Sequence, residues 1–334
     1  MTTLQQTITN TILAHKPTVL AGLLPLLLLL PKFLRLVGLI KARRLSLIAH
    51  TKERVLILGA TSGIGRSLAV LYAQRGASLC IVGRRDNLVN EVVEECQRLT
   101  RASVLGVMAD FTDVEDVLRV RDTIEKEWGS LDTLAIVAGV SALQPLMDVA
   151  QVPKCTGFNP DTAAKATKEG IQRAKDVSNA AVKGNFTGPL VSAVTFIPFL
   201  QATSRSPSIL LISSPAAVIP APTRSLYGST KAASLLLFQA LAIEHPRIKF
   251  THVLPGTVEG EFRAGAVDGG PVREKDPNKH GLKKEAVARR AIQAVDEGEK
   301  NVFMPWTMRA GHLGYWLAPF VIEWIASKKY NFQA

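Results

Sequence analysis

Seven short apolar runs alternate with helix-like segments through the middle of the chain, and this alternation constrains the fold more than any other feature. Each run ends at glycine, proline or a small polar residue, as buried strands do. Strands that alternate with helices predict a parallel sheet covered on both faces. The sequence therefore predicts an α/β fold with a doubly wound, seven-stranded parallel sheet. The predicted strands are 54–59, 78–83, 103–110, 133–139, 208–214, 249–256 and 301–305.

Two stretches between these segments, 140–170 and 257–281, are polar, contain glycine and proline, and are longer than ordinary connections. Connections of this length inside a compact domain are usually functional. Both are candidate lids over a pocket.

The first predicted strand leads directly into GATSGIG, residues 59–65, and the following residues predict a helix. Gly59, Gly63 and Gly65 let the backbone turn tightly and approach a pyrophosphate, whose charge is stabilised by amides at a helix start. On spacing alone, a plain strand-to-helix turn is an equal alternative. The strand before and the helix after favour a Rossmann-type nucleotide site.

Two arginines follow the second predicted strand, in Gly83-Arg84-Arg85. An acidic residue at this place would bind both hydroxyls of an NAD ribose, whereas guanidinium groups suit a 2′-phosphate. We therefore expect NADP(H) to be preferred, with NAD(H) as the other usable cofactor. The alternative is that one arginine only begins the next helix. Asp110, which ends the third strand, is placed to accept a hydrogen bond from the adenine amino group, with helix capping as the rival role.

Tyr227 and Lys231 lie one turn apart in a predicted helix, so both side chains lie on one face. A general acid or base works best near neutral pH, so a phenol with a pKa of about 10 must shift by about three units, or roughly 4 kcal/mol. A positive charge about 4 Å away, at an effective dielectric constant near 20, supplies about that much. Lys231 carries that charge.

Together these features resemble the short-chain dehydrogenase/reductase family over about residues 52–305. The matching residues are GATSGIG at 59–65, Asn185, Ser214, Tyr227, Lys231 and Pro255-Gly256. The resemblance implies hydride transfer between nicotinamide and a carbonyl carbon, with Tyr227 giving the proton to the oxygen. It implies cofactor contacts from Gly59, Thr61, Ser62, Gly63, Ile64, Gly65, Arg84, Arg85, Asp110, Gly139, Tyr227, Lys231, Pro255, Gly256 and Val258.

The resemblance also implies individual roles in the reaction. Lys231 holds the nicotinamide ribose, Ser214 hydrogen-bonds the substrate carbonyl, and Asn185 positions a water connected to Lys231. Alternatives remain for two of these residues: Ser214 as a loop cap, with Ser213 as its substitute, and Asn185 as the stabiliser of a helix bend.

The sequence departs from the family pattern in three places. Ile136-Val137 replaces the usual pair of asparagines before Ala138-Gly139, which puts stabilisation of the sheet edge in doubt. Gly260 replaces a threonine that often contacts the carboxamide. The segment from Gly139 to Asn185 is longer than usual, which predicts an added lid or membrane-facing element.

Residues 17–31 carry no charge and form an apolar segment near the amino terminus. As a helix it would be about 22 Å long, shorter than a bilayer core of about 30 Å. Extension to Ile40 would suffice but includes Lys32 and Arg35, and Pro25 and Pro31 also permit a hairpin in one leaflet. No small-residue cleavage site follows, so we expect a retained anchor.

The basic residues after this segment predict a cytosolic catalytic domain by the positive-inside rule. We expect the endoplasmic reticulum or a lipid droplet as the location, and a role in lipid metabolism. Residues 312–326, flanked by Arg309, Lys328 and Lys329, predict a helix that lies on a surface or docks. A helix packed on its own domain is the near-equal alternative.

The net charge of +12 favours anionic partners, but the basic residues are scattered and argue against nucleic acid. Cys80, Cys96 and Cys155 show no metal or disulfide spacing, and the histidines are dispersed, so we expect no metal site and a reducing compartment.

The sequence as a whole predicts three parts: an anchor and basic linker at 1–51, a catalytic domain at 52–305 and an apolar tail at 306–334. The expected activity is NADPH-dependent reduction of a lipophilic ketone or aldehyde by a membrane-anchored enzyme, similar to the hydroxysteroid dehydrogenase and ketosphinganine reductase branches. The alternatives are a catalytically idle nucleotide-binding scaffold and NAD-dependent alcohol oxidation. The resemblance also implies a homodimer that pairs through the helices carrying Asn185 and Tyr227.

Overall fold

The computed structural model describes residues 43–153, 164–272 and 276–332. The chain divides into two compact units, 1–46 and 47–334. The predicted anchor segment at 17–31 lies outside the described residues, and so do Cys155 and the middle of the long connection at 140–170. Short helices α3 (Arg43–Leu47) and η1 (His50–Lys52) precede the first strand.

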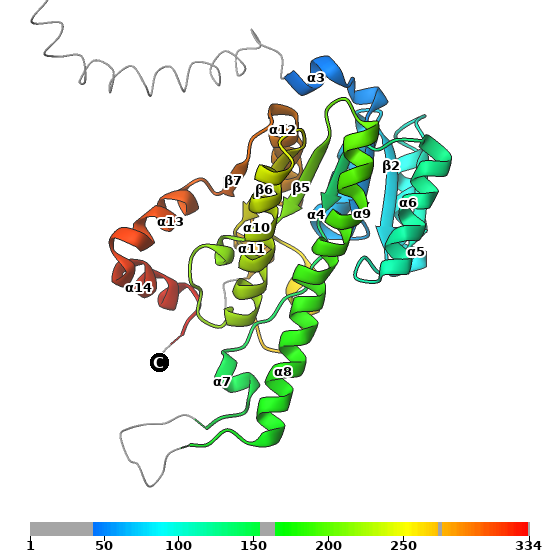
Figure 1. Ribbon diagram of the computed structural model, residues 1–334. Helices are drawn as coiled ribbons and strands as arrows, with labels where there is room; N and C mark the ends of the chain where they lie inside the picture. Colours follow the sequence, from blue (N-terminus) through cyan, green and yellow to red (C-terminus); the bar gives the residue numbers. More distant parts are fainter. Residues whose placement is uncertain (1–42, 154–163, 273–275, 333–334) are drawn as a thin grey trace, which may run out of the picture. The chain divides into compact units, whose positions relative to one another are not determined.

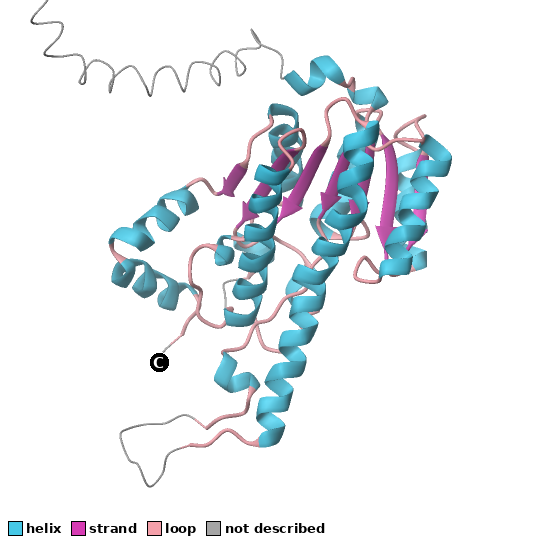
Figure 2. Cartoon of the chain, in the orientation of Figure 1, coloured by secondary structure: helices cyan, strands magenta, loops and turns pink. Residues whose placement is uncertain are grey.

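The second unit contains a seven-stranded, all-parallel sheet in the order β3-β2-β1-β4-β5-β6-β7, seen as the magenta arrows of Figure 2. The reversal of order between β1 and β4 is the point at which open α/β sheets bind ligands. The predicted fold class is confirmed. The strands are β1 (Arg54–Leu58), β2 (Ser78–Gly83), β3 (Val104–Met108), β4 (Thr133–Ile136), β5 (Ser208–Ile212), β6 (Lys249–Pro255) and β7 (Asn301–Met304).

Alternate residues of each strand face two separate cores, because successive side chains of a strand point to opposite faces. Val55 and Ile57 belong to one core, and Leu56 and Leu58 to the other. The first core is closed by α4 (Gly63–Gln74), α5 (Asp86–Gln97) and α12 (Lys284–Glu297). The second is closed by α6 (Val114–Trp128), α9 (Gly188–Thr203) and α10 (Ser225–Glu244) (Figure 1).

The ends of α6 show how local sequence sets these helices. The Asp113 side chain accepts a hydrogen bond from the Asp116 backbone N–H, which satisfies one of the amides left open at the helix start. At the other end Gly129 has φ 64°, the left-handed conformation that glycine adopts without strain. The sequence therefore marks both boundaries.

Three consecutive helical segments, α8 (Lys168–Val182), η3 (Lys183–Thr187) and α9, follow one another without a break. The middle segment is a π turn that contains Asn185. Pro189, near the start of α9, lacks the N–H that would bond to the Asn185 carbonyl in a regular α-helix. This missing donor gives a local reason for the widened turn.

The two predicted lid segments contact each other. In the described part of the first lies α7 (Leu146–Val149), and in the second lie η5 (Glu261–Arg263) and α11 (Pro277–His280). The buried Asp268 carboxylate accepts hydrogen bonds from the backbone N–H groups of Leu143 (2.6 Å) and Gln144 (2.7 Å). The Val267 N–H donates to the Ser141 carbonyl. These bonds hold the two segments together.

The carboxy-terminal stretch forms two helices, where the sequence predicted one over 312–326. They are α13 (Thr307–Leu317) and α14 (Pro319–Lys329). The chain breaks at Ala318, whose φ of −145° is not helical, because Pro319 cannot continue a hydrogen-bonded helix. Large apolar side chains on both helices are exposed, namely Leu313, Trp316, Leu317, Phe320, Val321, Trp324 and Ile325.

Two helical stretches, Lys168–Thr203 and Ser225–Glu244, are long and apolar enough to cross a membrane by length and composition. Parts of both pack against the sheet, as described above, and core helices of soluble proteins pass the same test. They give weak support for membrane association.

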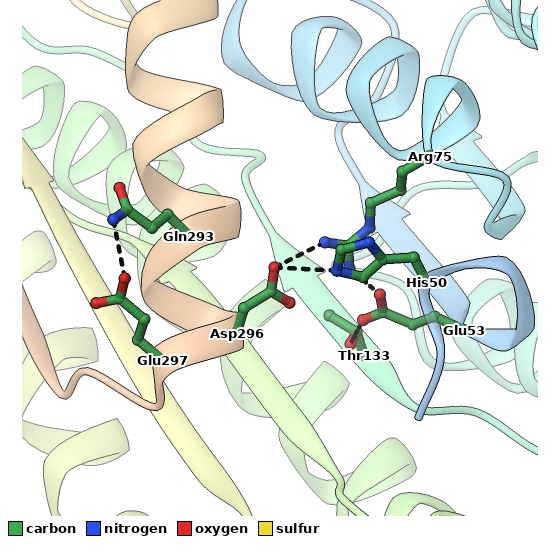
Figure 3. A network of polar contacts seen from close by, with 7 residues as sticks. All are labelled: His50, Glu53, Arg75, Thr133, Gln293, Asp296 and Glu297. Atoms are coloured by element: carbon green, nitrogen blue, oxygen red, sulfur yellow. Dashed lines mark hydrogen bonds and ion pairs between the residues drawn. The ribbon is translucent and has the colours of Figure 1, made fainter. Parts of the chain in front are cut away.

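The amino-end edge of the sheet carries a network of charges (Figure 3). Parallel strands begin at this edge, and the helices that run antiparallel to them end there. Arg75, after α4, forms ion pairs with Glu53 and with Asp296 of α12, the latter at 2.9 Å. Glu53, only 2% exposed, also accepts a hydrogen bond from Thr133 at 2.6 Å. His50 lies 3.6 Å from Asp296.

Candidate active site

The loop between β1 and α4 has the geometry that an approaching phosphate requires. Gly59 has φ 90°, and a Cβ there would come within 2.6 Å of the Ala138 nitrogen. A Cβ on Gly65 would collide with the Gly59 carbonyl. Gly63 has φ 54°, and a Cβ on it would meet no atom within 4 Å. The start of α4 therefore offers open space beside helix-terminal amides, and these residues fit a dinucleotide phosphate.

The other predicted residues of this loop are placed around it. Thr61 lies against Gly83 at the end of β2, where a Cβ would touch the threonine methyl group. Ser62 is the residue before α4, and its side chain makes no capping hydrogen bond. Ile64 packs against the first core. The hydroxyl of Ser62 thus remains available at the helix start.

Arg84 and Arg85 are both exposed at the carboxyl end of β2. Arg85 immediately precedes α5. This position agrees with the alternative that one of the two arginines only begins the helix. Asp110 follows β3, and its Oδ1 accepts hydrogen bonds from the Thr112 N–H (3.0 Å) and hydroxyl (2.8 Å). Asp113, rather than Asp110, caps α6.

Asn185, Lys231 and Gly139 meet at the end of β4. A Cβ on Gly139 would lie 2.7 Å from Asn185 Oδ1 and 3.1 Å from Lys231 Nζ. Asn185 is fully buried, accepts from the Val140 N–H at 2.9 Å and donates to Thr230 Oγ1 at 3.0 Å. Asn185 also lies in the π turn, so the alternative role, stabilising a bend in the helix, agrees with its position.

Lys231 is a buried cation. Its side chain is 5% exposed, and Nζ donates to the Ile212 carbonyl at 3.1 Å. Burial lowers the pKa of Lys231 from 10.5 to about 8, because a charged amine loses hydration there. At pH 7 most of these amines are still protonated. A positive charge therefore lies inside the site.

Ser214 ends the segment after β5 and begins η4 (Pro215–Ala217). Its Oγ accepts from the Ala216 N–H at 3.2 Å, so the loop-cap role is present, while the hydroxyl proton is not used in that bond. The Ser213 hydroxyl is buried and makes no hydrogen bond. Ser214 is the more accessible of the two.

Tyr227 is half-buried in the first turn of α10. A Cβ on the neighbouring Gly228 would come within 2.8 Å of the Ala216 carbonyl, so this turn packs closely on η4. The Tyr227 ring has an edge contact with Phe262 at 6.2 Å between centroids, and the Arg224 guanidinium lies 5.6 Å from its centroid.

Sequence reasoning missed both Phe262 and Arg224. Arg224 had a local signal, because it lies three residues before Tyr227 and so about one helical turn away. Phe262 had none, since it comes from a distant loop.

The segment after β6 supplies the remaining predicted residues. Pro255 is the last residue of β6, and the Gly256 N–H donates to the Met304 carbonyl at 2.7 Å. Val258 forms an isolated bridge with Leu282. Gly260 has φ 101°, a conformation that a threonine there would rarely adopt. The departure from the family pattern at Gly260 thus changes the backbone as well as the side chain.

A separate hollow of about 530 Å³ opens beside the start of α8 and is lined by charges of both signs, including Lys168, Arg173 and Asp176. It contains none of the predicted site residues. The strand ends, where the predicted residues gather, are the better candidate for chemistry.

The family described as short chain dehydrogenase matches residues 53–269. The 11-beta-hydroxysteroid dehydrogenase A of Sesamum indicum is 30% identical over 280 residues, 81% of this chain and 73% of that protein. The 11-beta-hydroxysteroid dehydrogenase 1A of Arabidopsis thaliana is 33% identical over 212 residues, and the match spans only 54% of its length.

Solved structures show the same fold. A short chain dehydrogenase/reductase from Burkholderia phymatum in complex with NAD has a TM-score of 0.64 at 17% identity, covering 79% of this chain and 94% of that one. An alcohol dehydrogenase from the archaeon Thermococcus sibiricus, complexed with 5-hydroxy-NADP, has a TM-score of 0.59 at 19% identity, covering 75% and 95%.

Proposed function

The chain belongs to the short-chain dehydrogenase/reductase family, and on that premise we propose that it reduces a lipophilic ketone or aldehyde with NADPH at a membrane. It is an oxidoreductase of that family. The convergence of Asn185 and Lys231 beside Gly139 is the observation that carries the proposal. It brings a buried cation and a hydrogen-bonding amide to the switch point of the sheet, where cofactors bind in this fold class.

NADPH, when bound, supplies the hydride. The amides at the start of α4 would hold its pyrophosphate, and Gly63 leaves room for close approach. Arg84 and Arg85, both exposed at the end of β2, would pair with the 2′-phosphate. Gly139, Pro255, Gly256 and Val258 would border the nicotinamide half.

In the proposed reaction Tyr227 donates a proton to the carbonyl oxygen. Lys231 stabilises the phenolate that remains, because its charge is buried and weakly screened. Ser214 donates a hydrogen bond from its hydroxyl group to the same carbonyl oxygen and keeps its proton. Asn185 holds a water that connects Lys231 to solvent and returns the proton to Tyr227.

Three observations support a lipophilic substrate. Phe262, 46% exposed, lies edge-on beside the Tyr227 ring and offers an apolar wall. The relatives from Sesamum and Arabidopsis are named as hydroxysteroid dehydrogenases. The apolar segment at 17–31 would hold the enzyme where such a substrate dissolves.

We place the catalytic domain on the cytosolic face of the endoplasmic reticulum or of a lipid droplet. The exposed apolar side chains of α13 and α14, with Arg309, Lys328 and Lys329 nearby in the sequence, suit the interface of an anionic bilayer. The ammonium of Lys328 lies 3.8 Å from the centroid of the Trp324 ring, a pairing of aromatic and basic groups typical of such interfaces.

A homodimer through α9 and α10 is part of the proposal. Val194 on α9 and Leu236 and Ile243 on α10 are large apolar residues exposed to solvent. A second copy would cover them. Leu236→Glu would then yield a monomer in light scattering of the detergent-solubilised protein, whereas Val114→Glu, at an exposed site on α6, would not.

A lipid-extract screen tests the activity. Purified full-length protein with NADPH should convert specific lipids to species that have gained two hydrogens, as seen by mass spectrometry, and Tyr227→Phe should abolish them. Reduction of small polar carbonyls alone, with sterols, long-chain ketones and retinal untouched, would exclude the lipophilic substrate.

Cofactor preference has its own test. Arg84→Asp should weaken NADPH binding by roughly tenfold or more, the loss of about one charge-assisted hydrogen bond, and leave NADH binding nearly unchanged. A wild-type preference for NADH would favour NAD-dependent alcohol oxidation instead.

A catalytically idle, nucleotide-binding scaffold is the second candidate, favoured by Ile136 and Val137 in place of the family's asparagines. Cofactor binding without turnover on a broad carbonyl panel, unchanged by Tyr227→Phe, would support it.

A further inference from the structure

Arg224 is a buried charge that the proposed reaction does not use. It immediately precedes α10 and is 5% exposed. A guanidinium loses much of its hydration on burial, so a buried arginine is stable only where it is hydrogen-bonded or paired. The contacts of the Arg224 guanidinium therefore indicate which role this residue has.

The guanidinium joins the Tyr227 ring to the segment after β4. Its carbon lies 5.6 Å from the ring centroid, within the range of a cation–π contact. Nη1 donates to Ser141 Oγ at 2.9 Å and to the Ala142 carbonyl at 3.3 Å. One side of the ring is thus fixed to a segment that continues directly from Gly139.

The same segment is joined to the chain after β6. The Ser141 carbonyl accepts from the Val267 N–H, and Asp268 accepts from the two residues after Ala142. Phe262, from that part of the chain, meets the Tyr227 ring edge-on at an interplanar angle of 65°. The ring therefore lies between Phe262 and Arg224, and Arg224 bonds directly to the segment after β4.

The backbone before Arg224 is strained. Thr223 is buried with φ 65°, a conformation that is rare for a β-branched residue and costs free energy. Such strain persists only where the surroundings enforce it. The next residue, Arg224, is held by the hydrogen bonds and the ring contact described above.

We propose that Arg224 is a positioning residue for Tyr227, fixing the direction of the phenol through a guanidinium that contacts the ring and is itself bonded to the Ser141–Ala142 segment. The inference rests on the proposed function, in which Tyr227 is the proton donor. A misplacement of about 1 Å can lower a catalytic rate roughly 100-fold, so a fixed ring has a direct consequence for turnover.

The test compares Arg224→Met, Arg224→Lys and Ser141→Ala in the full-length protein, with Arg247→Met as the control. Arg247 is an exposed arginine beyond the far end of α10. The measurements are kcat, KM for the carbonyl, the Kd for NADPH, and near-ultraviolet circular dichroism. The dichroism signal of Tyr227 is isolated by subtracting the spectrum of Tyr227→Phe, so it needs no substrate.

We expect Arg224→Met to lower kcat roughly 100-fold while the NADPH Kd changes less than about twofold, because the phosphate loop is untouched. Arg224→Lys should recover most of the loss, since it restores the cation beside the ring. Ser141→Ala should lower kcat several-fold. The Tyr227 dichroism should be lost in Arg224→Met and retained in Arg224→Lys and Arg247→Met.

Equal losses of kcat in the Met and Lys variants, or an unchanged Tyr227 dichroism in Arg224→Met, would overturn the inference. If Arg224→Met does not fold, unchanged kcat and dichroism in Ser141→Ala would overturn it instead. If the wild type reduces no carbonyl at all, the proposed function fails, and the dichroism comparison still decides whether Arg224 holds the ring.

Discussion

The amino-end and carboxyl-end edges of the sheet differ in how their charged side chains are paired. At the amino-end edge, Glu53 and Arg75 form an ion pair, and Asp296 pairs with the same arginine. At the carboxyl-end edge, Lys231 is buried with a backbone carbonyl as its hydrogen-bond acceptor. Opposite charges offset the loss of hydration at the first edge, whereas a lone amine at the second remains destabilised. The pairs at the amino-end edge join Glu53, α4 and α12, whereas the carboxyl-end edge keeps a cation that the proposed reaction would use.

The largest effect should follow from removing the proton donor. Tyr227→Phe should lower kcat by roughly 10²- to 10⁴-fold, the usual contribution of general acid catalysis. The free energy of unfolding should change by about 1 kcal/mol or less, the net value of one hydrogen bond. Steady-state kinetics and urea unfolding measure the two effects. A variant that retains full kcat would remove Tyr227 from the reaction.

Breaking the charge network at the amino-end edge should have the opposite result, a large loss of stability without a loss of turnover. Glu53→Ala should lower the free energy of unfolding by about 3–5 kcal/mol, because it removes the buried partner of an ion pair and leaves the partly buried Arg75 with one carboxylate fewer. Turnover per folded molecule should not change. The matched control is Glu91→Ala, which breaks the exposed pair with Arg66 and should cost less than about 1 kcal/mol. Equal losses in the two variants would contradict the comparison.

Lys231→Met should abolish turnover and yet stabilise the protein. A pKa lowered from 10.5 to about 8 corresponds to about 3 kcal/mol of destabilisation at pH 7, which the variant lacks. Between about pH 8 and 10.5 the unfolded chain binds more protons at this site than the folded one, so wild-type stability should rise with pH there.

This rise should be missing in Lys231→Met when urea unfolding is compared at pH 7 and pH 10. Other groups contribute equally to both proteins and cancel in the difference. A stability difference that does not depend on pH would show that the amine is not destabilised by burial.

A modest effect on both stability and turnover should come from Gly139→Ala. The added methyl group would press on Asn185 Oδ1, which is held by its bond to Val140, so we expect a cost of roughly 1 kcal/mol, the low end for overpacking. Turnover should fall at least tenfold, because Asn185 and Lys231 must shift. Gly129→Ala, at a helix end far from the site, is the control for loss of stability without loss of turnover.

Local patterns were sufficient for the sheet and for the phosphate loop. Each strand is a short apolar run that ends at a turn residue, and GATSGIG contains the glycines that its tight turn requires, Gly59 and Gly65. Helical spacing placed Tyr227 and Lys231 on one face. The family and the fold predicted from these residues are confirmed. The catalytic roles, the NADP preference and the anchor at 17–31 stay predictions.

What the sequence did not predict depends on contacts between distant segments. The contact between the Phe262 and Tyr227 rings joins the segment after β6 to α10, and no local pattern indicates it. The break at Pro319 was visible in the sequence, but an apolar run across it suggested one helix. Arg75 and Asp296 lie 221 residues apart, and no local pattern pairs them. The periodicity of a sequence predicts which face of a helix or strand a residue lies on. It does not predict which distant residue it contacts.

The long separation of Arg75 and Asp296 has a consequence for biosynthesis. Glu53 and Arg75 leave the ribosome early, whereas Asp296 is among the last residues of the domain to emerge. Until then Arg75 can pair with Glu53 but not with Asp296. The surface of α4 that packs against α12 is also still uncovered. Ribosome-bound chains truncated before residue 284 should therefore be good clients for chaperones, and release of the finished chain should end that dependence.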